Sequence, residues 1–435
     1  MSLTIMFIGL AVFLAHFLAL QFSRTYIPDV LVLMLLGILI GPVLGLVQAE
    51  DFGKAGSALA TIALVVILFE SGTALDLGTL RRSAGTTIAL TLLCFIFTTT
   101  IITVSGMGAF NLSPLPALIL GATLGGTASA VVIPLVGSLK MSVKPATVLV
   151  LESALTDVLC IVAVFALLQV VQGGVNAGQL VGSVLSAMVF AAVIGVAGGA
   201  GWMLVLHRVR GFPNTITATL AYVFFVYGLT EFLGFSGAIA ALSLGITLGN
   251  VKRLGLETLF RRDREIEPLS PEDINFYREA VFLLKTFFFI YLGISIRFGA
   301  LGLALVALGM VVAVYLMRVL LVRRVCSPAE YTPRDLAITA IMAPKGLAAA
   351  VLATLPLQNG VEGGELIRDV SYMVVLISIT LTALLVMLLP LPAAQRLLQL
   401  LLGRGDAPPA TDVAAASPQP GDPPPTAQGP PARKS

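Results

Sequence analysis

Charged side chains are scarce in this sequence of 435 residues, because Asp, Glu, Lys and Arg together make up only 11% of it. An average soluble domain carries about 25% charged residues. Hydrophobic residues reach 57% here, and the mean hydropathy is +1.00. This composition excludes an ordinary soluble protein and indicates a chain that crosses a membrane many times.

Two other patterns are missing. The apolar runs lack the period-two alternation of membrane β-barrel strands, so helices are expected, since a helix satisfies its own backbone hydrogen bonds in lipid. Residues 1–23 have neither a basic segment nor a small-residue cleavage site, which favours a retained first span over a signal peptide. Cysteine is rare, and Cys94, Cys160 and Cys326 are expected to be packing residues.

About thirteen apolar stretches have roughly the twenty residues that a helix needs to cross a bilayer core of about 30 Å. They lie at 2–21, 28–47, 57–75, 83–106, 115–137, 145–171, 177–206, 213–233, 236–250, 277–296, 300–322, 334–356 and 369–391. The predicted fold class is an all-α polytopic membrane protein. Its transmembrane domain is expected at 1–400, with a mixed-charge cytoplasmic linker at 251–275, and the Pro-rich segment 401–435 is expected to be a disordered cytoplasmic tail.

Basic residues are distributed unevenly between the two sets of loops. The loops after even-numbered spans hold only Lys54, Arg297 and Arg368, whereas the loops after odd-numbered spans and the C-terminal tail hold most of the other Lys and Arg residues. Loops rich in Lys and Arg stay in the cytoplasm. We therefore expect a plasma-membrane (cell inner membrane) protein with its N-terminus outside and its C-terminus in the cytoplasm.

The stretch "LESALTDVL" places two acids inside the sixth span. Glu152, Ser153, Thr156 and Asp157 form a stripe about 140° wide at the 100° per residue of a helix. An ionisable residue in this setting costs about 3 kcal/mol or more unless it is paired or hydrated. The stripe is expected to face an ion or proton route; the alternative is a buried hydrogen-bonded cluster that fixes helix packing.

Other charges also fall within spans. Glu231 and Lys285 lie near span ends, from which they can reach the interface. For Glu70, a structural ion pair and a transport role are both open, and Lys345 is either a helix-packing cation or part of the site.

Two spans are expected to be interrupted. In the fifth, Gly121, Gly125, Gly126 and Pro134 surround "TAS", and in the twelfth Pro344 and Gly346 flank Lys345. If spans 1–6 and 8–13 are two inverted six-helix repeats joined by span seven, both interruptions fall in the fifth helix of a repeat. Matching broken helices indicate the substrate site of a transporter.

With these motifs assembled, the chain resembles the monovalent cation:proton antiporter superfamily, the sodium/proton exchanger domain, over roughly residues 5–391. The motifs that carry the resemblance are "ESALTD" on span six, "APKG" on span twelve, "GTASA" on span five and "LFESGTALDL" on span three. The resemblance implies that Asp157 binds cation and proton alternately, that Glu152 pairs with Arg318, and that the protein is a homodimer. Thr156 and Ala128 depart from the family pattern, which has Asn or Asp at the first position and often an acid at the second.

We therefore expect a secondary antiporter that exchanges a monovalent cation, Na⁺ in the leading interpretation with K⁺ or Li⁺ as alternatives, for H⁺ across the lipid bilayer. Small hard cations prefer oxygen ligands, which Asp157, Thr156, Ser153, Thr127 and Ser129 would supply. K⁺/H⁺ exchange and an anion or organic-acid carrier are the alternative functions. The sequence shows no metal-ligand cluster or nucleophile–base motif, so neither an enzyme nor a cofactor is expected, and no nucleic-acid partner.

Overall fold

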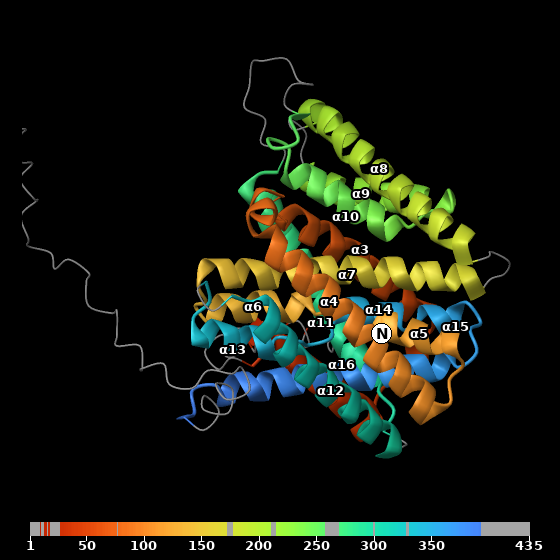
Figure 1. Cartoon of the computed structure of the whole chain (residues 1–435). Coiled ribbons are helices and arrows are strands. Elements are labelled where there is room, and N and C mark those ends of the chain that lie inside the picture. The colour runs from red at the N-terminus through yellow and green to blue at the C-terminus, as the bar shows by residue number, and fades with distance from the viewer. Residues whose placement is uncertain are drawn as a thin grey trace, which may run out of the picture.

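The computed structural model describes residues 27–75, 77–171, 177–209, 215–256, 269–298, 301–327 and 330–392, together with isolated positions between 9 and 17. Within these residues the chain is helical and contains no β-strand (Figure 1). This agrees with the predicted fold class. The bounds of the helices are α2 (Asp29–Ile38), η1 (Leu39–Val43), η2 (Ala49–Phe52), α3 (Gly53–Ala74), α4 (Leu77–Phe110), α5 (Pro114–Thr123), α6 (Ser129–Ser138), α7 (Val143–Val171), α8 (Ala177–Val209), α9 (Thr215–Phe232), α10 (Gly237–Gly249), α11 (Pro271–Ser295), α12 (Leu301–Val325), α13 (Pro333–Ile341), α14 (Leu347–Leu352), α15 (Leu355–Gln358) and α16 (Gly364–Leu388).

The predicted spans from the second to the thirteenth each coincide with a helix or with a series of shorter helices. Among the described residues, five helices are long and apolar enough to cross a membrane by themselves: Gly85–Phe110, Val143–Val171, Ser186–Leu206, Leu301–Val325 and Gly364–Leu388. The total of thirteen crossings stays a prediction. Most of the predicted first span, residues 257–268 of the predicted linker and the predicted tail lie outside the described residues.

Three helices begin five or six residues before the predicted spans: α4 at Leu77, α11 at Pro271 and α16 at Gly364. Helix α11 begins at Pro271, inside the predicted linker and before the predicted span start at 277. The Ser270 side chain accepts a hydrogen bond from the Asp273 backbone N–H, and the Asp273 side chain accepts one from the Ser270 backbone N–H. This reciprocal capping satisfies two free donors and extends the helix into the charged segment.

The helices pack in two groups. In the first group, α3 packs on α10 and α11, α10 on α8 and α9, and α11 on α2. In the second group, α4 packs on α5, α7 and α12, and α12 on α13 and α16. Figure 1 shows α8, α9 and α10 along one side of the molecule, α12, α13 and α16 along the opposite side, and α7 across the middle.

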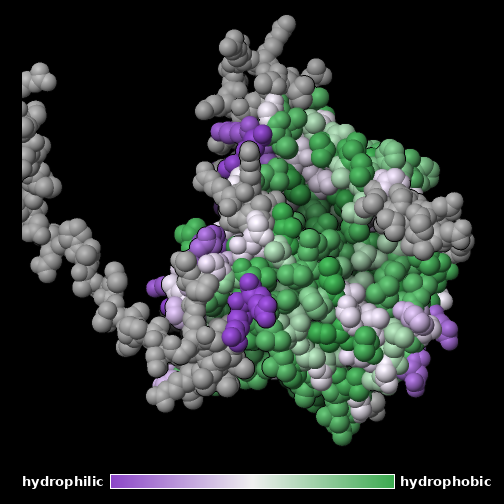
Figure 2. All heavy atoms as spheres, in the orientation of Figure 1, coloured by the Kyte–Doolittle hydropathy of each residue, from purple (hydrophilic) through white to green (hydrophobic). Residues whose placement is uncertain are grey.

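The surface is organised as expected for a protein in a bilayer. Figure 2 shows a broad hydrophobic region across the middle of this face, with hydrophilic residues gathered toward two opposite edges. Large apolar side chains on α4, α8, α12 and α16 are exposed, for example Val104, Phe190, Leu316 and Leu384. Lipid, and not water, is the environment in which such exposure is stable.

Both predicted interruptions are present. The first lies between α5 and α6 at residues 124–128, and the second lies between α13 and α14 at residues 342–346. Gly121 and Pro134, expected at the first interruption, lie instead inside α5 and α6. A Cβ atom at Gly121 would lie 2.4 Å from Thr103 Oγ1, so this glycine allows close packing of α5 on α4.

Candidate ion-binding site

The two interrupted segments touch each other through their backbones. The Ala128 N–H donates a hydrogen bond of 2.7 Å to the Pro344 carbonyl. Gly346 faces Ala128 so closely that a Cβ atom on it would lie 2.4 Å from the Ala128 Cβ. The glycine therefore sets how near the two segments can approach.

We expect Gly346→Ala to push the two segments apart and to lower both thermal stability and cation flux. The added methyl group has no free space, and the Ala128 backbone cannot yield without losing its bond to Pro344. Combining it with Ala128→Gly removes the opposing Cβ, so the double variant is expected to recover part of the melting temperature. Equal losses in the single and double variants would contradict this steric explanation.

Asp157 lies beside the first interruption. Its carboxylate accepts a hydrogen bond of 3.0 Å from the Ser129 hydroxyl at the start of α6. Asp157 and Ser129 line a cavity of about 10 Å³ with Leu64 and Leu68 of α3 and Ala348 of α14. Measured as space for a water molecule's centre, this is about the smallest volume that holds one water.

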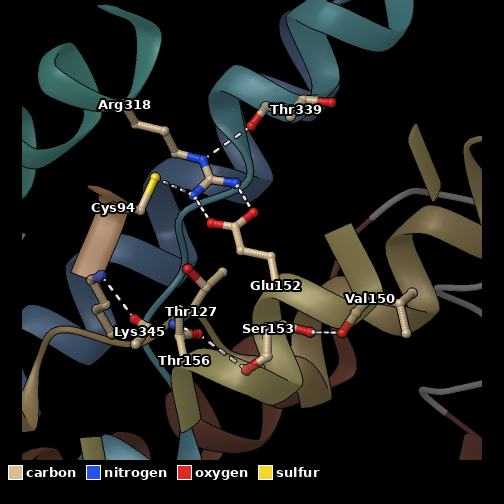
Figure 3. Close-up of polar contacts among 10 residues, drawn as sticks. Cys94, Thr127, Val150, Glu152, Ser153, Thr156, Arg318, Thr339 and Lys345 are labelled. Carbon is tan, nitrogen blue, oxygen red and sulfur yellow. Dashed lines mark hydrogen bonds and ion pairs between the residues drawn. The ribbon is translucent and has the colours of Figure 1, made fainter. Parts of the chain in front are cut away.

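The other predicted oxygen ligands are engaged with neighbours. The Thr127 backbone N–H donates to Thr156 Oγ1 at 3.0 Å, and that hydroxyl donates to the Ser153 carbonyl. Ser153 itself donates to the Val150 carbonyl inside α7 (Figure 3). The structure therefore joins Asp157 to Ser129 and Thr156 to Thr127, while the Ser153 hydroxyl bonds within its own helix.

Glu152 and Arg318 form a bidentate ion pair (Figure 3). Arg318 Nη1 and Nη2 lie 2.5 and 2.8 Å from the two carboxylate oxygens, and both side chains are buried. The guanidinium also donates through Nε to the Thr339 carbonyl and through Nη1 to Cys94 Sγ. The pair therefore links α7 to α12, with further contacts on α4 and α13.

Lys345 is buried in the second interruption and reaches the first. Its Nζ donates to the Gly126 carbonyl at 2.8 Å, and its backbone N–H donates to Ser378 Oγ on α16. The Gly126 carbonyl follows the C-terminal end of α5, where the helix dipole is negative. The ammonium group therefore compensates that end and ties the two interruptions together.

The remaining charges predicted within spans have partners elsewhere. Lys285 pairs with Asp29 of α2 at 2.6 Å, and Glu231 accepts a hydrogen bond from the Gly237 N–H at the start of α10. Glu70 is partly buried on α3, where the charges of Arg278 and Lys285 on α11 act on it.

Three residues near the site were not identified from the sequence. Tyr315 donates to the Ser378 carbonyl and shares a hydrogen bond with Thr382 Oγ1. Ser378 and Thr382 are spaced i, i+4 in the apolar helix α16, and this polar pair was an available signal.

Known proteins resemble this chain in sequence. The chain is 26% identical over 382 residues to Na(+)/H(+) antiporter 1 of Methanocaldococcus jannaschii, with 81% of this chain and 83% of that protein covered. It is 25% identical over 374 residues to a K(+)/H(+) antiporter NhaP2 of Shewanella sp. (strain MR-4), with 82% of this chain covered. The chain spans 61% of the length of that NhaP2 relative.

A solved structure of the sodium proton antiporter MjNhaP1 from Methanocaldococcus jannaschii at pH 8 matches with a TM-score of 0.72 and 22% sequence identity. The match covers 88% of this chain and 99% of that one, so the two share a fold. The model of the family described as sodium/hydrogen exchanger, transmembrane, matches residues 9–388. This match extends over most of the chain and includes both interruptions, Asp157 and the Glu152–Arg318 pair, so the chain belongs to the sodium/hydrogen exchanger transmembrane family.

Proposed function

We propose that this protein is a secondary antiporter that exchanges a monovalent cation, Na⁺ in the leading interpretation, for H⁺. The observation that carries the proposal is the position of Asp157, a carboxylate beside the contact between two interrupted helices. Interrupted helices inside a membrane protein supply free backbone groups for ion sites. A carboxylate there can hold either a proton or a cation.

Exchange follows from competition at this one group. A proton on Asp157 neutralises the charge that attracts the cation, and a bound cation excludes the proton. Ser129, with backbone carbonyls of the first interruption and water, would complete the oxygen ligands of a hard cation. Thr156, Ser153 and Thr127 are proposed as further oxygen ligands of the cation. Glu152, Arg318, Lys345 and Glu70 are assigned as structural or coupling charges.

Coupling also requires that the site face one side of the membrane at a time. We assign this movement to the second helix group together with α6 and α14, which pack on α7 and complete both interruptions. These helices would turn against the first group. The proposal includes thirteen spans, two inverted repeats, a homodimer in the cell inner membrane, an outside N-terminus and a cytoplasmic C-terminus.

The transported cation is tested by flux. The relatives are named as Na(+)/H(+) and K(+)/H(+) antiporters, which makes K⁺ the second candidate. Purified protein in liposomes with a trapped pH dye is exposed to gradients of Na⁺, K⁺, Li⁺ and chloride in turn. Proton movement driven by one or more of the cations supports antiport, whereas movement driven only by the chloride gradient would indicate an anion carrier.

We expect one-for-one electroneutral exchange. Asp157 is the carboxylate left for exchange at this site, because Glu152 is held by Arg318 and neither Thr156 nor Ala128 can titrate. The measurement is transport current on a supported membrane, with the same vesicles checked for flux. Steady currents that grow with cation concentration and vanish in Lys345→Gln would contradict the expectation and assign a second exchanged proton to Lys345.

A further inference from the structure

The shortest chain connection between the two helix groups is the one from α3 to α4. Three chain connections run between the groups, at residues 75–76, 172–176 and 296–300. Helices α3 and α4 pack on different partners, α3 on α10 and α11 and α4 on α5, α7 and α12. Because this connection is so short, the start of α4 can move little relative to the end of α3.

The side chain of Asn250, the residue after α10, forms hydrogen bonds with the backbone on both sides of the connection between α3 and α4. Its Nδ2 donates to the Leu75 carbonyl at 2.7 Å and to the Ile246 carbonyl at 2.9 Å, and its Oδ1 accepts from the Leu77 N–H at 2.9 Å. The residue is 3% exposed. The amide nitrogen and the amide oxygen of Asn250 are thus both hydrogen-bonded. Their partners lie on Leu75 before α4, on Leu77 at the start of α4, and on Ile246 within α10.

A second contact lies next to it. The guanidinium of Arg253 fills the space beside Gly78, where a Cβ atom would lie 1.4 Å from Nη1. The segment after α10 therefore contacts the beginning of α4 through two side chains, one by hydrogen bonds and one by close packing.

We propose that Asn250 is a positioning residue that fixes the pivot about which the second helix group turns against the first. The inference rests on the proposed alternating-access function. Asn250 belongs to the first group through α10, and its amide holds the first backbone N–H of α4, which belongs to the second. When the second helix group rotates about this point, Asp157 is exposed to one side of the membrane and then to the other, while the start of α4 stays in place.

The first test separates turnover from binding. Asn250→Ala is expected to lower the maximum exchange rate at least about fivefold and to leave the apparent KM for the cation within about twofold, because the residues of the ion site are unchanged. Thr247→Ala is the matched control: Thr247 is buried near the end of α10, and its hydroxyl donates to the Ser243 carbonyl in the same helix. A parallel change in KM, or an equal loss of rate in Thr247→Ala, would overturn the assignment.

The second test replaces the amide by a covalent link. In Asn250→Cys/Leu77→Cys, the reduced protein is expected to exchange slowly, and a short bismaleimide link is expected to restore the rate, because a pivot keeps its separation through the cycle. The same link in Leu64→Cys/Ala348→Cys joins the two groups across the Asp157 cavity and is expected to stop exchange. Wild-type protein treated with the same bismaleimide is the control for reaction at the three native cysteines, which are all buried.

Loss of exchange in the linked Asn250→Cys/Leu77→Cys protein would overturn the proposal, since it would show that residues 250 and 77 must separate during transport. Failure of the proposed function gives a different result, because wild-type liposomes would then show no cation-driven proton movement at all.

Discussion

Asp157→Asn is expected to abolish cation-driven proton movement. Asparagine keeps the size of the side chain and can still accept the Ser129 hydrogen bond, but it carries no negative charge and cannot bind a proton in exchange for a cation. Cation binding and proton release are both removed, so the residual rate should equal that of protein-free liposomes. The measurement is dye-reported proton flux at matched amounts of reconstituted protein.

Glu231→Gln is the control. Glu231 is also an acid in the membrane domain, and its carboxylate accepts a hydrogen bond from the Gly237 N–H at the start of α10, which a glutamine oxygen can also do. This variant is expected to retain most of the wild-type rate. Wild-type exchange in Asp157→Asn would exclude Asp157 as the exchanging carboxylate.

Among the substitutions proposed here, those that break the Glu152–Arg318 pair are expected to lower the free energy of unfolding most. Both groups are buried, with side-chain exposures of 0% and 2%, and removal of one partner leaves the other as an uncompensated buried charge. Such a loss typically costs about 3–5 kcal/mol. Glu152→Gln and Arg318→Met should each lower the unfolding temperature of the detergent-solubilised protein strongly.

The double variant tests the interaction itself. Glu152→Gln/Arg318→Met contains no unpaired charge, so it is expected to regain part of the stability that either single variant loses. Residues in one ion pair show non-additive effects in such a cycle, whereas independent residues add. Strictly additive losses would mean that the pair contributes no coupling, despite its bidentate geometry.

The sequence by itself determined the class of the molecule. Bilayer thickness sets the length of an apolar helix, and the cost of a charge in lipid makes each intramembrane acid visible. These local constraints predicted the helices and the stripe on α7, and the positions of Gly and Pro predicted both interruptions. The exact break points were less predictable, because Gly121 and Pro134 are compatible with a continuing helix when neighbouring helices support them.

Only the tertiary structure decided which polar groups meet. The bond between Ala128 and Pro344, the contact of Lys345 with the Gly126 carbonyl and the hold of Asn250 on Leu75 and Leu77 join residues that are far apart in the chain. Hydropathy and periodicity describe one helix at a time and contain no information about such pairs. Asn250 has no charge to mark it, so its role emerged only where two separate helices brought backbone groups to its amide. The geometry of the ion site is likewise a property of two crossing segments, and neither sequence stretch specifies it alone.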